Sequence, residues 1–118
     1  MKIRYEEIVK ANEPLSILSK EKVSVKEAVG IARIIKAFRE EFMIYQEKER
    51  ELLDKYCEPT ENGGFKCKDE EAARAFNKEF KELIDFEIDL AIEPVKLVSD
   101  IKIDAETILL IDKFIDFE

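Results

Sequence analysis

The chain has 118 residues, of which 46% are hydrophobic and 41% are charged. Its length suits one ordinary domain with a modest core, and its composition is too apolar for intrinsic disorder. The 28 acidic and 20 basic side chains give a formal net charge of −8, which disfavours direct binding to the phosphates of nucleic acids. We therefore expect one folded domain over residues 1–118, mainly α-helical, that does not bind nucleic acid directly.

Two further features of the sequence exclude some classes of function. No segment approaches the roughly 20 uncharged apolar residues of a membrane-spanning helix, and residues 1–7 lack the apolar core of a signal peptide. We therefore expect a cytoplasmic protein without membrane contact. The chain also contains no histidine, which excludes serine–histidine and cysteine–histidine nucleophiles. We expect a protein that is not an enzyme and that holds no cofactor and no metal.

The first part of the chain predicts a strand and two helices. Residues 1–4 can form a short strand, and the apolar residues after it recur at helical spacing to about Ser19. A longer helix begins at Ser24, because Ser24-Val25-Lys26-Glu27 is a capping box in which serine and glutamate side chains accept hydrogen bonds from backbone amides. Apolar residues then recur at spacings of three and four to Tyr56, interrupted by Glu49. One helix of about 50 Å is predicted, longer than a compact domain of this size is wide.

A reversing turn and a third helix follow. Pro59 ends the long helix, and Asn62–Gly63 is a pair that tolerates the positive φ of a tight turn. Asp69 is a suitable N-cap for a helix whose apolar stripe can pack antiparallel on the long one. The sequence therefore predicts a long antiparallel helical hairpin. The stripe of the third helix consists of Ala72, Ala73, Phe76, Phe80, Leu83 and Ile84.

The last part of the chain predicts a small β element and a closing helix. Apolar residues alternate strictly over 86–92, as in a half-buried strand, and a looser alternation resumes after Pro94. We expect a β element of two or three strands that can include residues 1–5. Asp104 then caps a short C-terminal helix that extends to Ile115. The predicted fold class is mainly α (α+β), with a short N-terminal helix before the hairpin.

Two groups of carboxylates form the one pattern that could support catalysis. If the hairpin brought both groups together, they could bind magnesium, as in all-helical nucleotide pyrophosphatases. Lysine and arginine are interleaved with these acids, however, which is typical of solvated helices with ion pairs between residues i and i+4. A magnesium-dependent nucleotide hydrolase is therefore a remote alternative. The acids are Glu47, Glu51 and Asp54 on the long helix and Glu79, Glu82 and Asp85 on the third.

Three small residues also call for an interpretation. Gly30 lies inside the long helix, where its lack of a side chain is expected to permit close helix packing. Cys57 and Cys67 flank the reversing turn, so they form either a disulfide that closes the turn or two reduced thiols. A cytoplasmic compartment favours the thiols. With no histidine in the chain, these two cysteines cannot complete a four-ligand zinc site.

Aromatic and leucine side chains on the long helix are the candidate binding surface. The third helix is about half as long as the long one, so part of the apolar stripe is expected to stay uncovered. Aromatic residues surrounded by charge are favoured at protein interfaces. We therefore expect binding to a protein partner or self-association there. The candidate interface residues are Phe42, Tyr45, Leu52, Leu53 and Tyr56.

The order and spacing of five segments form a further pattern. They are Lys22-Val23-Ser24-Val25-Lys26-Glu27-Ala28, Glu51-Leu52-Leu53-Asp54-Lys55-Tyr56, Glu61-Asn62-Gly63, Phe76-Asn77-Lys78-Glu79-Phe80-Lys81-Glu82-Leu83 and Ile103-Asp104-Ala105-Glu106-Thr107-Ile108-Leu109-Leu110. Together they resemble a family of small uncharacterised proteins of tailed bacteriophages and prophages, often encoded near virion and tail genes. The resemblance implies a phage origin and no enzymatic activity, and it supplies no catalytic residues. The chain departs from the family at Cys57, where a glycine is common.

From the candidate interface, the charge and the resemblance, we expect one of two functions. The first is a non-enzymatic phage accessory protein that acts through protein–protein contacts in virion or tail morphogenesis, with the hairpin as its docking surface. Its partner would be a virion protein or a second copy of the chain, in the cytoplasm of an infected or lysogenic bacterium or in the virion. The alternative is an inhibitor of a host defence system, whose acidic helix faces compete with nucleic acid for a cationic channel.

Overall fold

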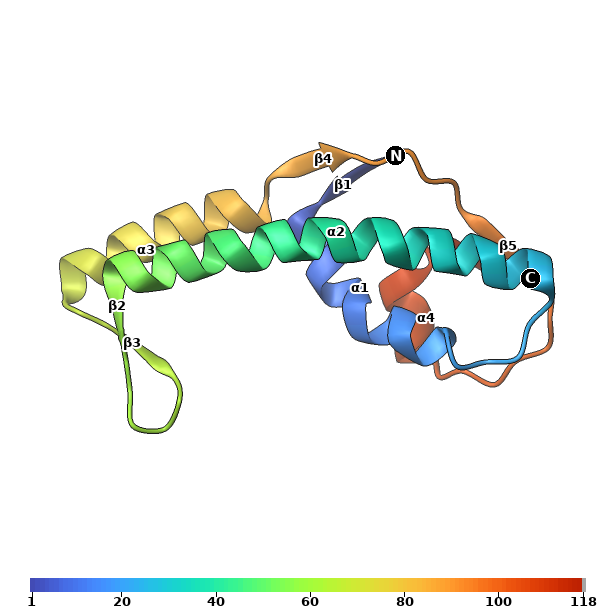
Figure 1. Ribbon diagram of the computed structural model, residues 1–118, viewed down its shortest axis with the longest axis horizontal. Coiled ribbons are helices and arrows are strands. Elements are labelled where there is room, and N and C mark those ends of the chain that lie inside the picture. Colours follow the sequence, from blue (N-terminus) through green and yellow to red (C-terminus); the bar gives the residue numbers. More distant parts are fainter. Residues whose placement is uncertain (118) are drawn as a thin grey trace.

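The length of the molecule follows its longest helix, α2 (Val25–Tyr56) (Figure 1). The computed structural model describes residues 1–117 and measures 52 × 30 × 21 Å. At 1.5 Å per residue, the 32 residues of α2 span about 48 Å. The radius of gyration is 17.2 Å, compared with about 13.5 Å for a compact domain of this length. The predicted long helix is thus confirmed, and it makes the molecule elongated.

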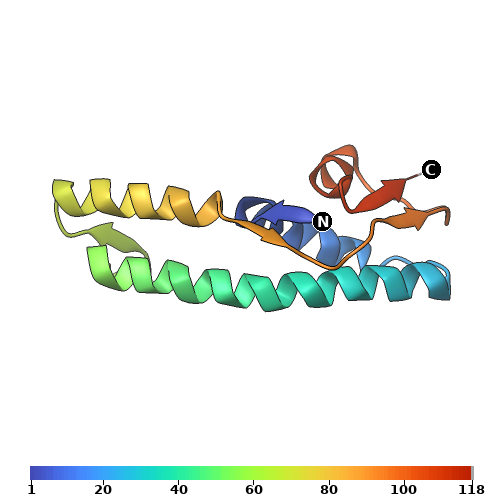
Figure 2. The same cartoon turned by 90° about the horizontal axis from the view of Figure 1, so that it is seen from above.

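The other helices also begin where local signals predicted them. Helix α1 (Tyr5–Leu18) crosses the first half of α2, α3 (Glu70–Ile84) lies antiparallel on the second half, and α4 (Ala105–Ile111) packs on α1 (Figures 1 and 2). Asp69 accepts a hydrogen bond from the Ala72 amide at 2.7 Å. None of the helices within residues 1–117 combines the length and the apolar character needed to cross a bilayer.

A small β element is present, and it consists of three separate pairs of strands within residues 1–117. The antiparallel pair β1–β4 joins the N-terminus to the segment after α3, and the antiparallel pair β2–β3 lies in the turn between α2 and α3. The pair β5–β6 is parallel. The strands are β1 (Lys2–Arg4), β2 (Cys57–Pro59), β3 (Phe65–Cys67), β4 (Glu87–Asp89), β5 (Val95–Leu97) and β6 (Ile115–Phe117).

Residues 1–117 contain six strands in three pairs, where two or three strands were expected, and the β2–β3 pair lies in the predicted turn. Two further details also differ from the expectation. The alternation over 86–92 forms a strand only at Glu87–Asp89, and Pro94, which cannot donate a ladder hydrogen bond, separates it from β5. The closing helix was expected to reach Ile115 and instead ends at Ile111. Phe114 and Ile115 lie three and four residues after Ile111, so their spacing imitates a helix. They are buried as the chain enters β6, and the Val95 amide donates to the Phe114 carbonyl at 2.9 Å.

The hydrophobic core lies at one end of the rod. It is formed by α1, the first half of α2, α4 and strands β1, β5 and β6. The rings of Phe38 and Phe114 meet edge to face, with centroids 4.9 Å apart. No residue of α3, by contrast, is fully buried. The far half of the rod therefore consists of two helices that cover each other only in part. The largest fully buried side chains are Phe114, Ile3, Ile8, Leu18, Ile34, Ile111 and Ile115.

Gly30 marks the closest approach of α2 to β5. A Cβ atom built on Gly30 would lie 2.7 Å from Cγ2 and 3.4 Å from Cγ1 of Val95. Valine is branched at Cβ and has few rotamers available, so its side chain cannot turn away freely. The sequence predicted close helix packing at Gly30. The close approach is present, but the neighbour of Gly30 is strand β5 and not a helix.

We predict that Gly30→Ala lowers the free energy of unfolding by about 1–3 kcal/mol, because overpacking outweighs the gain of about 1 kcal/mol in helix propensity. The measurement is denaturant unfolding of a double-mutant cycle with Val95→Ala. In the Val95→Ala background, Gly30→Ala should cost much less or should stabilise the protein. An equal loss in both backgrounds would show that contact with Val95 is not the reason for the glycine.

Candidate interaction surface

The five predicted interface residues fall into two groups along α2. Phe42 and Tyr45 belong to the end of the core, with their ring centroids 5.9 Å apart. Tyr45 is only 5% exposed, because Tyr5 at the start of α1 covers it with ring centroids 6.0 Å apart. The expectation that Tyr45 is uncovered is therefore wrong, and Phe42 is half-buried against the core. Tyr5 lies far from Tyr45 in the sequence, so no local sequence pattern indicates this contact.

The hydroxyl groups of the two tyrosines are tied to carboxylates on α2. Tyr45 donates to Glu49 Oε2 at 2.5 Å, and Tyr5 donates to Glu41 Oε2 at 2.9 Å. Burial, followed by the bond to Glu41, raises the pKa of Tyr5 to about 12. Burial, followed by the bond to Glu49, raises the pKa of Tyr45 above its ordinary value. Both tyrosines therefore stay protonated donors, and Glu49 interrupts the apolar stripe because it binds Tyr45 one turn earlier.

The second group, Leu52, Leu53 and Tyr56, lies beyond the core. Each is half-buried, and within residues 1–117 none of them is among the side chains that pack against the core. Their neighbour is α3, where the rings of Phe76 and Phe80 stack with centroids 5.6 Å apart. We call these five residues the hairpin seam: Leu52, Leu53, Tyr56, Phe76 and Phe80.

Sequence reasoning missed several apolar side chains that are more exposed than the seam. Met43 is 68% exposed and Ile44 is 46% exposed. Both lie off the apolar stripe with spacings of three and four, so a search for the buried face of the helix passes over them. Phe65 in β3 and Phe86 after α3 are also exposed, although Phe86 stacks on Tyr5 with centroids 5.9 Å apart. Single exposed apolar residues are common on protein surfaces, so these four positions do not by themselves indicate an interface.

The carboxylates of the hairpin have basic neighbours. Glu51 pairs with Lys48 at 3.3 Å, and Asp85 pairs with Lys81 at 2.8 Å and with Arg4 at 3.5 Å. Such exposed pairs each contribute little to stability. Within the described part of the chain, no group of three or more cysteine, aspartate or glutamate side chains is arranged to hold a metal ion.

Glu79 is the exception among these acids. It is half-buried on α3, and its Oε2 atom is covered by protein without a hydrogen-bond partner in the described residues. An interaction with Tyr56, followed by the negative charge of Glu79, raises the pKa of Lys55. The cation of Lys55 also lies 5.0 Å from the centre of the Tyr56 ring. The seam therefore has a charged edge on which one acceptor atom is not satisfied.

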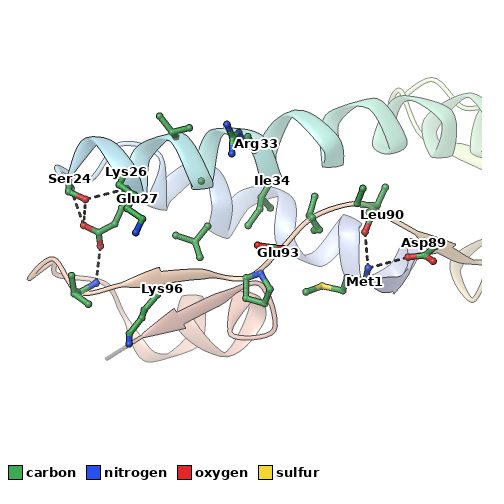
Figure 3. Close-up of a pocket in the computed structure, with 17 residues that line it drawn as sticks. Met1, Ser24, Lys26, Glu27, Arg33, Ile34, Asp89, Leu90, Glu93 and Lys96 are labelled. Atoms are coloured by element: carbon green, nitrogen blue, oxygen red, sulfur yellow. Dashed lines mark hydrogen bonds and ion pairs between the residues drawn. The ribbon is translucent and has the colours of Figure 1, made fainter.

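A groove of about 1220 Å³ lies at the other end of the rod, between the first half of α2 and the extended segment 89–98 (Figure 3). Its lining combines basic residues, such as Lys26 and Arg33, with acidic residues, such as Asp89 and Glu93. Apolar side chains from both elements complete the lining. This mixture of charges and apolar groups does not select one class of ligand.

Glu27 closes one end of this groove. Its carboxylate completes the predicted capping box with Ser24 (Figure 3). It also accepts hydrogen bonds from the amides of Val98 at 2.8 Å and Ser99 at 3.1 Å. The Ser99 hydroxyl donates to it as well. Glu27 is 5% exposed, and bonds from Ser24 and Ser99 hold its pKa at about 2. The local sequence indicated the cap, and it gave no sign of the contacts with residues 98–99.

Glu27 should make the stability of the protein depend on pH. Because its pKa is lowered from an ordinary 4.5 to about 2, its contribution is complete above pH 4.5 and is lost as the pH falls towards 2. We predict that Glu27→Gln melts at a lower temperature than the wild type at pH 7. The difference should shrink on acidification, as followed by circular dichroism. Glu40→Gln, at an exposed position of the same helix, is the control, and a gap that stays constant with pH would contradict the prediction.

Comparison with protein-family models, with curated proteins and with solved structures gives no match to the chain. The geometry of the molecule itself is therefore the basis for assigning a function. That geometry combines a half-covered apolar seam, further exposed apolar residues on the surface and acids that are dispersed among bases.

Proposed function

We propose that the chain acts by binding another protein through the hairpin seam, and that it is not an enzyme. The observation that carries this proposal is that α3 has an apolar stripe and no fully buried residue. A helix in a finished domain normally buries such a stripe against other elements. Among the described residues α2 is the main neighbour of α3, and the core also contacts Phe80 near the end of α3, so most of the seam remains available to a partner.

The chemistry of the seam suits a protein partner. Aromatic side chains, such as those at the centre of the seam, are enriched among the residues that carry most of the binding free energy at protein interfaces, and charged residues surround the seam as a polar rim. A further helix laid along the seam would cover Leu52, Leu53 and Tyr56 from one side and the stacked pair Phe76 and Phe80 from the other. This arrangement would be the helix-in-groove mode of recognition.

The setting of this contact is proposed from the resemblance to small proteins of tailed bacteriophages. It supports an accessory role in virion or tail morphogenesis, in the cytoplasm of an infected or lysogenic bacterium. The partner would then be a virion protein or a second copy of the chain. The net charge of −8 is compatible with the alternative function, an inhibitor that competes with nucleic acid for a host protein. The two functions differ in how partner binding responds to a negative charge introduced in the seam.

We predict that Leu53→Glu weakens partner binding by about tenfold or more, because it places a charge in a desolvated apolar contact. Gln46→Glu adds the same charge at an exposed position of α2 and should bind as the wild type does. The measurement is affinity purification from infected or lysogenic cells with mass spectrometry, followed by titration with the recovered protein. Circular dichroism confirms that both variants are folded.

The outcomes separate the proposed function from its rivals. Binding that survives Leu53→Glu and falls steeply with salt would instead support an acidic competitor of nucleic acid. A wild-type chain that is monomeric in light scattering and recovers no protein would contradict binding through the seam. Magnesium-dependent nucleotide turnover that is lost in Glu82→Ala would contradict the non-enzymatic assignment.

A further inference from the structure

The two cysteines lie at the base of the turn that joins α2 to α3. Cys57 follows the last residue of α2, and Cys67 lies two residues before Asp69, the N-cap of α3. In the β2–β3 pair they are directly opposite each other, and their sulfur atoms are 3.4 Å apart. Both are free thiols.

The hydrogen bonds of this pair of strands show which kind of position the cysteines occupy. The amide of Lys68 donates to the carbonyl of Tyr56, and the amide of Thr60 donates to the carbonyl of Gly64. Bonded and non-bonded positions alternate along an antiparallel ladder, so Cys57 and Cys67 form a non-bonded pair. Pro59, which has no amide hydrogen, lies in the next non-bonded pair, as this register requires.

A non-bonded pair is well placed for a covalent link. Its Cα atoms are about 4.5 Å apart, within the range of about 4.4–6.8 Å that disulfides span. The two sulfur atoms need to approach by only about 1.4 Å to reach the bond length of about 2.05 Å. A disulfide can therefore form here without a rearrangement of either strand.

The two thiols differ in access. Cys57 is buried, and Cys67 is partly exposed. Burial, followed by the facing thiol of Cys67, raises the pKa of Cys57. Cys67 is therefore the thiol that an oxidant in solution reaches first, and Cys57 is held beside it to complete the reaction.

We propose that Cys57 and Cys67 form a reversible dithiol–disulfide pair that locks the turn between α2 and α3. A low-molecular-weight disulfide, such as glutathione disulfide, is the oxidant. The thiolate of Cys67 attacks one sulfur of glutathione disulfide, forms a mixed disulfide and releases one glutathione thiolate. The thiolate of Cys57 then attacks the sulfur of Cys67 and releases the second glutathione. The chain loses two electrons and two protons, and glutathione disulfide gains them as two molecules of glutathione.

This disulfide would mainly affect the stability of α3 on α2. In the reduced chain, the connection between the helices runs through the whole of 57–67, whereas the disulfide makes it continue directly from Cys57 through Cys67 to Lys68. The disulfide reduces the conformational freedom that the loop between Cys57 and Cys67 has when this part of the chain is unfolded. Because α3 has no fully buried residue, its packing on α2 is the part of the molecule that gains most from a shorter connection.

The first test is oxidation of the full chain in glutathione redox buffers, read by thiol titration and mass spectrometry. The wild type should lose both thiols, become lighter by two hydrogen atoms and remain one chain on a non-reducing gel. Cys57→Ser should stop at a mixed disulfide with glutathione on Cys67. Retention of both thiols in excess glutathione disulfide, glutathione on both cysteines, or chains linked to each other would overturn the proposal.

The second test is hydrogen exchange of backbone amides in the reduced and the oxidised chain. Amides of α3 should exchange more slowly by about tenfold or more after oxidation, whereas those of α1 should be unchanged. The double variant with Cys57→Ser and Cys67→Ser should exchange equally with and without glutathione disulfide. Formation of the bond without a change in α3 would overturn its role as a lock. These readouts need no binding partner, so they are independent of the proposed function.

Discussion

One buried carboxylate fixes the relation between the long helix and the last part of the chain. Glu27 accepts hydrogen bonds from Ser24 within its own helix and from Val98 and Ser99 some seventy residues later. A charged group is stable away from water only when its acceptor sites are filled in this way. The segment after β5 is thereby held against the start of α2, and the position of β5 beside Gly30 brings Leu97, α4 and β6 into the core.

This anchoring divides α2 into two unequal environments. Its first half is enclosed by α1, β5 and the C-terminal elements, whereas its second half has α3 as its main neighbour (Figures 1 and 2). Tyr45 is the last fully buried residue of α2, and it is covered there by Tyr5 from α1. Beyond that point the apolar side chains are only half covered. The same helix can therefore serve as a structural support at one end and present an apolar surface at the other.

Elements that depend on local signals could be predicted from the sequence, and contacts between distant residues could not. The start of α2 at Ser24 and the N-cap of α3 at Asp69 follow from side chains that bond to amides three residues away, so a short window of sequence contains the information. The burial of Tyr45 depends on Tyr5, and the second role of Glu27 depends on Ser99. The sequence predicts a helix as far as Ile115, because Phe114 and Ile115 repeat the helical spacing after Ile111, whereas Ile115 begins β6. In the candidate surface, the sequence predicts uncovered side chains from the shorter length of the third helix. The structure places α3 along the part of α2 that carries Leu52, Leu53 and Tyr56, so this length argument does not explain why they are only half-buried.

The parallel pairing of β5 with β6 has a consequence for the order of events during synthesis. Phe114 and Ile115 are among the largest fully buried side chains, so the body of the protein cannot complete its interior until they have left the ribosome. The α2–α3 hairpin consists of segments joined by a short turn, and contacts of this kind form early. A nascent chain would therefore present the hairpin before the body has closed. Within that interval the apolar side chains of the unfinished interior are exposed, which makes the nascent chain prone to aggregation.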